Sequence, residues 1–62
     1  MDLSIYLGKK VRVEVFNGFY YEGEILNIDE KDNSIEIRDK FGKLITLSEK
    51  AIIFIREIGE GQ

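Results

Sequence analysis

Apolar residues recur at every second position along much of this chain, and this period of two limits its fold more than any other feature. Val11, Val13 and Val15 alternate with polar residues. Successive side chains of a β-strand point to opposite faces, so the pattern predicts a strand with one buried face. Asn17-Gly18 follows, the strongest short-range signal for a two-residue hairpin, because both positions of that turn need a positive φ. The sequence therefore predicts an antiparallel pair of strands.

Further strands are expected beyond this turn. The second strand runs from Phe19 to about Asp29, and its alternation changes phase beside Gly23, as it does at a bulge or a bend. A bent strand can belong to both halves of a small barrel. The other expected elements are a helical turn at 2–7, which Asp2 can cap, and strands at 34–39, 44–47 and 51–58. The fold class is therefore all-β, a small five-stranded, strongly bent antiparallel barrel with a short N-terminal helical turn.

The length of the chain, 62 residues, leaves room for one core. We expect a single domain over 1–62, with its core at 7–58 and a loose tail at 59–62. Domains of this size bury only about 60% of the surface that the unfolded chain exposes. Disulfides, metals or oligomerisation usually compensate. The sequence has no cysteine and no histidine, so self-association is the compensation we expect.

The final strand has an unusual pattern. Ile52, Ile53, Phe54 and Ile55 are apolar at four consecutive positions, so both faces of the strand need burial. One interpretation is that the second face and the strand edge meet another subunit, since an exposed apolar edge would otherwise aggregate. The alternative is that the N-terminal turn covers it.

Composition excludes several classes of function. Without histidine or cysteine, and without a glycine-rich phosphate loop, the chain is not expected to be an enzyme or to hold a cofactor or a metal. Nine basic and twelve acidic residues give a net charge of −3, whereas tight non-specific binding of nucleic acid normally needs a basic surface. No apolar run approaches the roughly 18 residues of a membrane span. We expect a cytoplasmic protein that does not enter a membrane.

One set of spacings is more specific. Tyr21-x-Gly23-x-Ile25 is followed by Asp29 and Asn33, six and ten residues after the glycine. Upstream, the first strand opens with Leu7-Gly8-Lys9-Lys10-Val11-Arg12-Val13. This pattern resembles the first motif of the Sm-like (LSm-type) family, in which an aromatic-x-Gly-x-Leu strand leads to a loop with Asp and Asn. The resemblance extends from Leu7 to about Arg56.

The resemblance implies a strongly bent five-stranded barrel that assembles into a ring of six or seven subunits, a hexamer or heptamer. The fourth strand of one subunit would pair with the fifth strand of the next. It also implies a ribonucleoprotein role, with single-stranded, often uridine-rich RNA held near the pore. Asn33 would bond a base edge and Asp29 would hold the loop. The RNA-binding residues are then Asp29, Lys31, Asn33, Ser48 and Lys50. The oligomer interface would comprise Leu44, Thr46, Ile52, Ile53, Phe54 and Ile55.

The chain departs from the family at the base pocket. Lys31 occupies the position of the usual stacking aromatic, Asp32 that of a hydrophobic residue, and Ser48 that of the usual arginine. Stacking contributes about 1–3 kcal/mol per base, so the pocket is weakened. Asp29 and Asn33 also suit ordinary turn positions, because Asx side chains bond their own backbone.

Three hypotheses follow. The first is a ring-forming Sm-like subunit that binds RNA. The second is an oligomeric Sm-like scaffold that binds a protein partner. The third is a Tudor-like or SH3-like barrel whose hairpin aromatics grip a cationic side chain of a peptide. Those aromatics are Phe16, Phe19, Tyr20 and Tyr21, which suit cross-strand pairing equally well.

Overall fold

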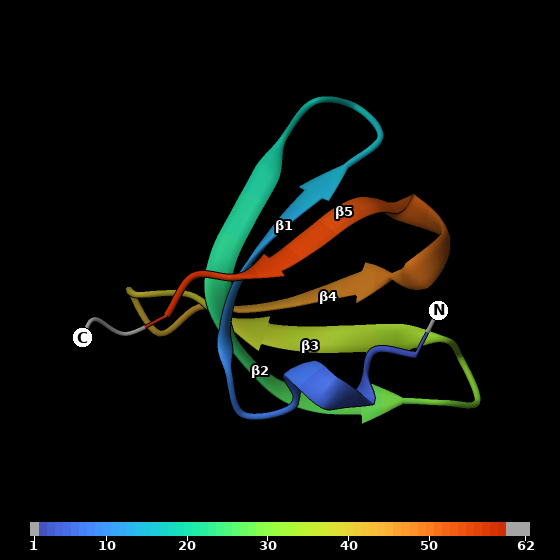
Figure 1. The fold of residues 1–62 in the computed structure, drawn as a ribbon, viewed down its shortest axis with the longest axis horizontal. Coiled ribbons are helices and arrows are strands. Elements are labelled where there is room, and N and C mark those ends of the chain that lie inside the picture. The colour runs from blue at the N-terminus through green and yellow to red at the C-terminus, as the bar shows by residue number, and fades with distance from the viewer. Residues whose placement is uncertain (1, 60–62) are drawn as a thin grey trace.

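Five antiparallel strands form one curled sheet in the computed structural model, which describes residues 2–59 (Figure 1). The strands are β1 (Lys10–Val15), β2 (Tyr20–Asp29), β3 (Ser34–Arg38), β4 (Leu44–Ser48) and β5 (Ile52–Glu57), with 3-10 helices η1 (Ser4–Tyr6) and η2 (Glu49–Ala51) before β1 and β5. The order across the sheet is β4-β3-β2-β1-β5, so β4 and β5 are its edges. The predicted all-β, five-stranded antiparallel fold is confirmed. In the described part of the chain no backbone ladder joins β4 to β5, so the sheet is bent but open.

The core lies on the concave face of this sheet. It contains Leu3, Val11, Val13, Val15, Ile25, Ile35, Ile37, Leu47 and Ile52. The alternation predicted for β1 and β3 is confirmed, because every second side chain of each strand is buried. Leu3 is 5% exposed and lies ahead of the expected core boundary at residue 7. Within residues 2–59 no helix is long and apolar enough to span a membrane.

The N-terminal turn is shorter than predicted. Only Ser4–Tyr6 is helical. Asp2 Oδ1 accepts hydrogen bonds from the Ser4 hydroxyl (2.6 Å) and backbone N–H (3.0 Å), and these bonds hold the pKa of Asp2 below its usual value. The N-cap position is Leu3, without a side-chain cap bond, so Asp2 holds the first residue of the turn from one position ahead of the N-cap and does not occupy the predicted cap. The expected loose tail lies outside the described residues, apart from Gly59.

β2 bends at Gly23 and joins the two halves of the sheet. Glu24, the next residue, pairs with Lys10 of β1 on one side and with Arg38 of β3 on the other. A Cβ atom on Gly23 would overlap the Arg38 carbonyl oxygen and come within 2.6 Å of Ile37 Cγ2. Only glycine permits so close an approach of β3 to β2.

Two bulges decide which side chains reach the core. The register of β2 and β3 shifts between Ile25 and Asn27, and Ile25 and Ile28 then pair with inward residues of β3. The phase change predicted a bulge or a bend beside Gly23, and the bulge lies at Leu26, three residues beyond this glycine. The register of β1 and β5 shifts in the same way. Val15 pairs with Ile52 and Glu14 pairs with Phe54, so Ile53 is the extra residue of β5. A bulge adds one residue to one strand, so apolar residues three positions apart can face the same side.

The second bulge revises the interpretation of the last strand. Ile52 is 7% exposed, and Ile55 packs against the same core, so two of the predicted interface residues are used inside the chain. Ile53 and Phe54 are 63% and 51% exposed, so the N-terminal turn does not cover them. The predicted interface residues of β4, Leu44 and Thr46, are also exposed.

The first hairpin differs from the prediction as well. The Gly18 N–H donates to the Val15 carbonyl oxygen (3.0 Å), and the Val15 N–H donates to the Phe19 carbonyl oxygen (3.0 Å). Gly18 has a φ of 90°, whereas Asn17 is not among the described residues with positive φ. The loop therefore has three residues, 16–18, and is a turn followed by a left-handed glycine rather than a two-residue turn.

Gly23→Ala should destabilise the protein by more than about 1 kcal/mol, because β2 and β3 must move apart to admit a Cβ atom. In a domain of this size each lost kcal/mol lowers Tm by about 4–8 °C. Thermal unfolding followed by circular dichroism measures this. Glu30→Ala, in an exposed turn, is the control and should melt within about 2 °C of the parent. Equal melting of the two variants would show that β3 does not approach Gly23.

The bulge in β5 predicts opposite outcomes for neighbouring isoleucines. Ile52→Ala should cost roughly 2–4 kcal/mol, because it leaves a cavity in the core. Ile53→Ala should change the free energy of unfolding by less than about 0.5 kcal/mol, because that side chain is exposed. Urea denaturation of both variants measures the difference. Equal losses would place Ile53 against the core and contradict this register.

Candidate functional site

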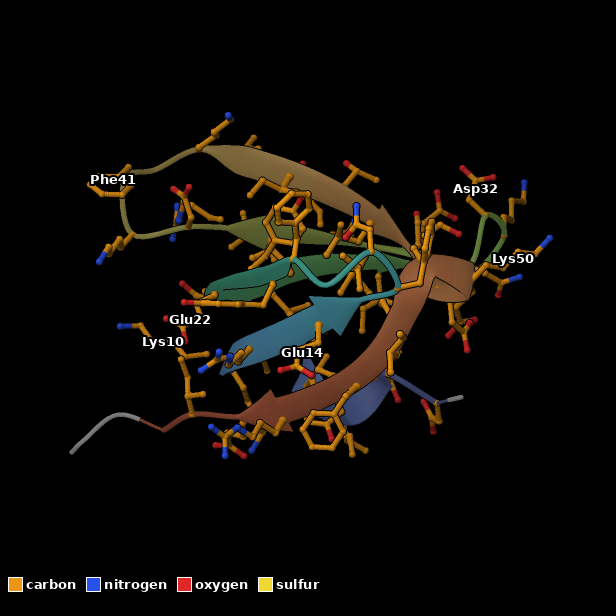
Figure 2. All side chains as sticks on the ribbon, turned by 90° about the horizontal axis from the view of Figure 1, so that it is seen from above. Lys10, Glu14, Glu22, Asp32, Phe41 and Lys50 are labelled. Atoms are coloured by element: carbon orange, nitrogen blue, oxygen red, sulfur yellow. The ribbon has the colours of Figure 1, made fainter. Side chains whose placement is uncertain are left out.

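The residues predicted to bind RNA lie together at one end of the sheet. The Glu49 N–H donates to the Asn33 carbonyl oxygen (2.7 Å), which ties the β2–β3 loop to η2. Figure 2 shows Asp32 and Lys50 at this end, which we call the loop end. It comprises residues 29–33 and 48–51, and thus all five predicted RNA-binding residues, namely Asp29, Lys31, Asn33, Ser48 and Lys50.

Several polar residues of the loop end hold their own backbone. Asp29 Oδ1 accepts hydrogen bonds from the backbone N–H groups of Lys31 (2.9 Å) and Asp32 (3.2 Å). Ser48 Oγ accepts one from the Lys50 N–H (3.2 Å) at the start of η2. Asn33 has a φ of 53°, a left-handed conformation that asparagine adopts more readily than most residues. Asp29 and Asn33 therefore have the ordinary turn roles that were the alternative to RNA binding.

The loop end is acidic. A hollow of about 260 Å³ is lined by Asp2, Asp29, Glu30 and Glu49, with no basic residue in its lining. Such a hollow repels phosphate groups. In the described part of the chain, no group of three or more acidic residues is placed to hold a metal ion.

A larger groove lies at the other end of the sheet. Its volume is about 590 Å³, and it runs between the first half of β2 and the start of β4. Figure 2 shows Phe41, Glu22 and Lys10 at this end, away from Asp32 and Lys50. We call it the end groove, and its lining comprises Lys10, Tyr20, Tyr21, Glu22, Gly23, Glu24, Arg38, Asp39, Lys40, Phe41, Ile45 and Ile58.

The floor of the end groove is apolar. Tyr21 and Ile45 are half-buried and pack against the core. Phe41, in the β3–β4 turn, is 84% exposed. Asp39 Oδ1 holds this turn by accepting hydrogen bonds from the backbone N–H groups of Phe41 (2.9 Å) and Lys43 (2.8 Å). The turn therefore presents an aromatic side chain to solvent on an ordered backbone.

The rim of the end groove is charged. Arg38 pairs with Glu24 at 3.2 Å. Within residues 2–59 neither Lys10 nor Lys40 forms an ion pair, and the Lys40 ammonium lies 5.5 Å from the centre of the Phe41 ring. The rim thus keeps two lysines that form no ion pair with a carboxylate of the described chain.

Most charged residues of the described chain lie toward one of the two ends, and Glu14 and Glu36 are counted at neither. We call the end of the sheet that carries the end groove the groove end. Its acidic residues are Glu22, Glu24, Asp39 and Glu57, and its seven basic residues are Lys9, Lys10, Arg12, Arg38, Lys40, Lys43 and Arg56. The loop end and its hollow have two basic residues, Lys31 and Lys50, against five acidic ones, Asp2, Asp29, Glu30, Asp32 and Glu49. In the described chain the groove end is therefore positive by three charges and the loop end negative by three.

One aromatic residue of the first hairpin, Tyr20, already contacts a cation of the same chain. The Arg12 guanidinium lies 3.8 Å from the centre of the Tyr20 ring, so one face of this ring already binds a cation of the same chain. Arg12 also pairs with Glu22 at 3.8 Å. A cationic side chain of a partner would have to displace Arg12 to reach this face of Tyr20.

Comparison with known proteins gives one structural match. No family model matches the chain, and no curated protein matches it. The fold is similar to a chain in the structure that describes activation of the Dcp1:Dcp2 mRNA decapping complex by Edc3 and Scd6, with a TM-score of 0.83 and 22% sequence identity. The alignment covers 97% of this chain and 62% of the matched chain, so this chain spans about three fifths of it. The match shows the fold of a small β domain.

This match corrects the function predicted from the sequence. The leading prediction was an Sm-like ring subunit that binds RNA. The matched chain instead comes from an assembly in which proteins activate a protein complex, and no family model supports an Sm-like ring. The RNA-binding hexamer or heptamer is therefore withdrawn, and the second hypothesis, a protein partner, fits better. The acidic hollow at the loop end gives a physical reason, because it repels an RNA backbone.

Asp29→Ala should destabilise the protein by about 1 kcal/mol, because the N–H groups of Lys31 and Asp32 lose their acceptor. Asp29→Asn keeps an acceptor oxygen at the same place, so its free energy of unfolding should fall by only a few tenths of a kcal/mol. Urea denaturation of the two variants measures the difference, and amide hydrogen exchange at Lys31 locates it. Parental stability of Asp29→Ala would mean that the carboxylate does not hold this loop.

Proposed function

We propose that this chain is a protein-binding β domain that recognises its partner through the end groove. The main support for this proposal is the combination of apolar and charged side chains that lines the end groove. Protein-binding sites commonly combine an apolar, aromatic centre with a polar rim. Tyr21, Phe41 and Ile45 supply the centre, and Lys10 and Lys40 belong to the rim.

Exposure of large apolar side chains supports the proposal. Phe41 is the most exposed of them in the described chain, and it lies in a turn that is held by Asp39. Exposed apolar clusters bordered by polar residues mark interaction sites in soluble proteins. An aromatic side chain on an ordered turn also loses little conformational entropy on binding, which favours its use as an anchor.

The structural match supports a protein partner as well, since the matched chain was solved within an assembly of several proteins. We retain the Sm-like architecture as part of this proposal. Its support is the Tyr21-x-Gly23-x-Ile25 motif, whose glycine lies at the bend of β2, together with the strand order β4-β3-β2-β1-β5.

We further propose that the domain acts by binding and not by catalysis. The chain contains no histidine or cysteine to serve as a nucleophile, a general base or a thiolate ligand. A cytoplasmic location is part of the same proposal, and it rests on the sequence prediction and on the match to a chain of a decapping assembly.

The proposal predicts a partner that contacts Phe41. A photo-crosslinking amino acid at position 41, introduced in the full chain in cells, should give a discrete protein adduct that survives ribonuclease treatment. The same amino acid at position 31, at the loop end, is the matched control and should not give that adduct. The partner is then identified by mass spectrometry, purified and titrated against the parent and Phe41→Ser.

Phe41→Ser should weaken binding of the purified partner by about tenfold, the size of loss typical for an aromatic anchor. Its thermal unfolding should match that of the parent, because Phe41 is exposed. Adducts at position 31 but not at 41 would contradict a partner site in the end groove. Adducts to RNA alone would contradict the protein-binding function altogether.

A further inference from the structure

The end groove does not share the acidic net charge of the chain, because three basic residues of its lining, Lys10, Arg38 and Lys40, balance three acidic ones. In the described chain the groove end is positive by three charges, although the whole sequence is acidic. Ion pairs neutralise part of the rim, through Arg38 with Glu24 and Arg12 with Glu22. Lys10 and Lys40 lack such a partner within residues 2–59. A ligand that enters the groove therefore meets two available ammonium groups beside an apolar floor.

The shape and chemistry of the floor limit the ligand further. Tyr21, Ile45 and Ile58 line the groove, together with the half-buried Gly23. Its volume of about 590 Å³ is large enough for one or two large side chains of a ligand. Burial of one Leu or Phe side chain contributes about 1.5–3 kcal/mol, so such a residue would supply much of the affinity.

From these two observations we infer that the end groove binds a protein segment in which a large apolar residue is flanked by acidic residues. The apolar side chain enters between Tyr21 and Ile45, beside Phe41. The flanking carboxylates reach Lys10 and Lys40. This inference rests on the proposed protein-binding function and specifies the chemistry of the partner.

A nucleic acid fits the same groove less well. Glu22, Glu24 and Asp39 line the groove together with the basic residues, so a continuous phosphate backbone would meet these carboxylates as well as the two ammonium groups. A peptide can place its few carboxylates opposite Lys10 and Lys40 and present uncharged atoms to the acidic positions. Charges interspersed in this way favour a discrete acidic segment over a polyanion.

Three short fluorescein-labelled peptides test the inference by fluorescence anisotropy with the full chain. The first alternates Asp and Glu with Leu, the second has Lys in place of the acidic residues, and the third has Ser in place of Leu. We expect the first to bind more tightly than either of the others by about fivefold or more, and its binding to weaken as salt is added.

Charge reversal at the two ends of the sheet provides the matched variants. Lys10→Glu combined with Lys40→Glu should weaken binding of the first peptide by about tenfold. Lys31→Glu combined with Lys50→Glu makes the same change of net charge at the loop end and should alter binding by less than about twofold. Amide NMR spectra of both variants report whether the fold is kept, and shifts at Gly23 and Phe41 on adding peptide locate the site.

Tighter binding of the Lys-containing peptide would overturn the inference, as would equal effects of the two charge reversals. Displacement of the first peptide by oligouridine at lower concentration than by unlabelled peptide would overturn it in favour of a polyanion ligand. If a partner that crosslinks at position 41 binds through a neutral or basic segment, the inference fails while the protein-binding function stands. The absence of any protein adduct at position 41 is the separate result that contradicts that function.

Discussion

The close approach of β3 to β2 at Gly23 is the constraint on which the rest of the structure depends. A single antiparallel sheet can bury only one face, and a flat one would leave that face without a partner. The bend at Gly23 brings Val11 and Ile37 to the same interior, so the sheet covers its own concave face. The end groove lies at the same bend, because Gly23 lines it together with Tyr21 and Ile45.

The two bulges explain how far the sequence predicted this fold. Apolar patterns and turn residues located all five strands to within one or two residues, and the phase change beside Gly23 indicated a bulge or a bend in β2. The bulge in β5 was missed, since no glycine marks it and Ile52–Ile55 read equally well as a strand buried on both faces. In both strands the core residues are isoleucines three positions apart, Ile25 with Ile28 and Ile52 with Ile55. This spacing could have indicated the second bulge.

The candidate sites differ in how far sequence reasoning could reach them. The residues of the loop end were found because Asp29 and Asn33 lie close together in the chain, but their residue types suit a turn and a binding site equally. The end groove was not found. Its lining comes from residues 10, 20–24, 38–41, 45 and 58, which only the bend brings together. The net charge of −3 is likewise a sum over two oppositely charged ends. The sequence gives only this sum, because strand pairing decides which charged residues lie at which end.

The sheet edges show why an open sheet of this kind does not require a ring. β4 has only five residues, and Lys43 precedes it while Glu49 and Lys50 follow it. β5 has a bulge at Ile53 and ends in Arg56 and Glu57. Short strands, bulges and charged residues are the usual means by which proteins prevent edge-to-edge pairing. The apolar run that suggested a subunit interface is therefore divided in two. Ile52 and Ile55 stabilise the core, whereas Ile53 and Phe54 are exposed, and the bulge at Ile53 makes this edge unfavourable for further strand pairing.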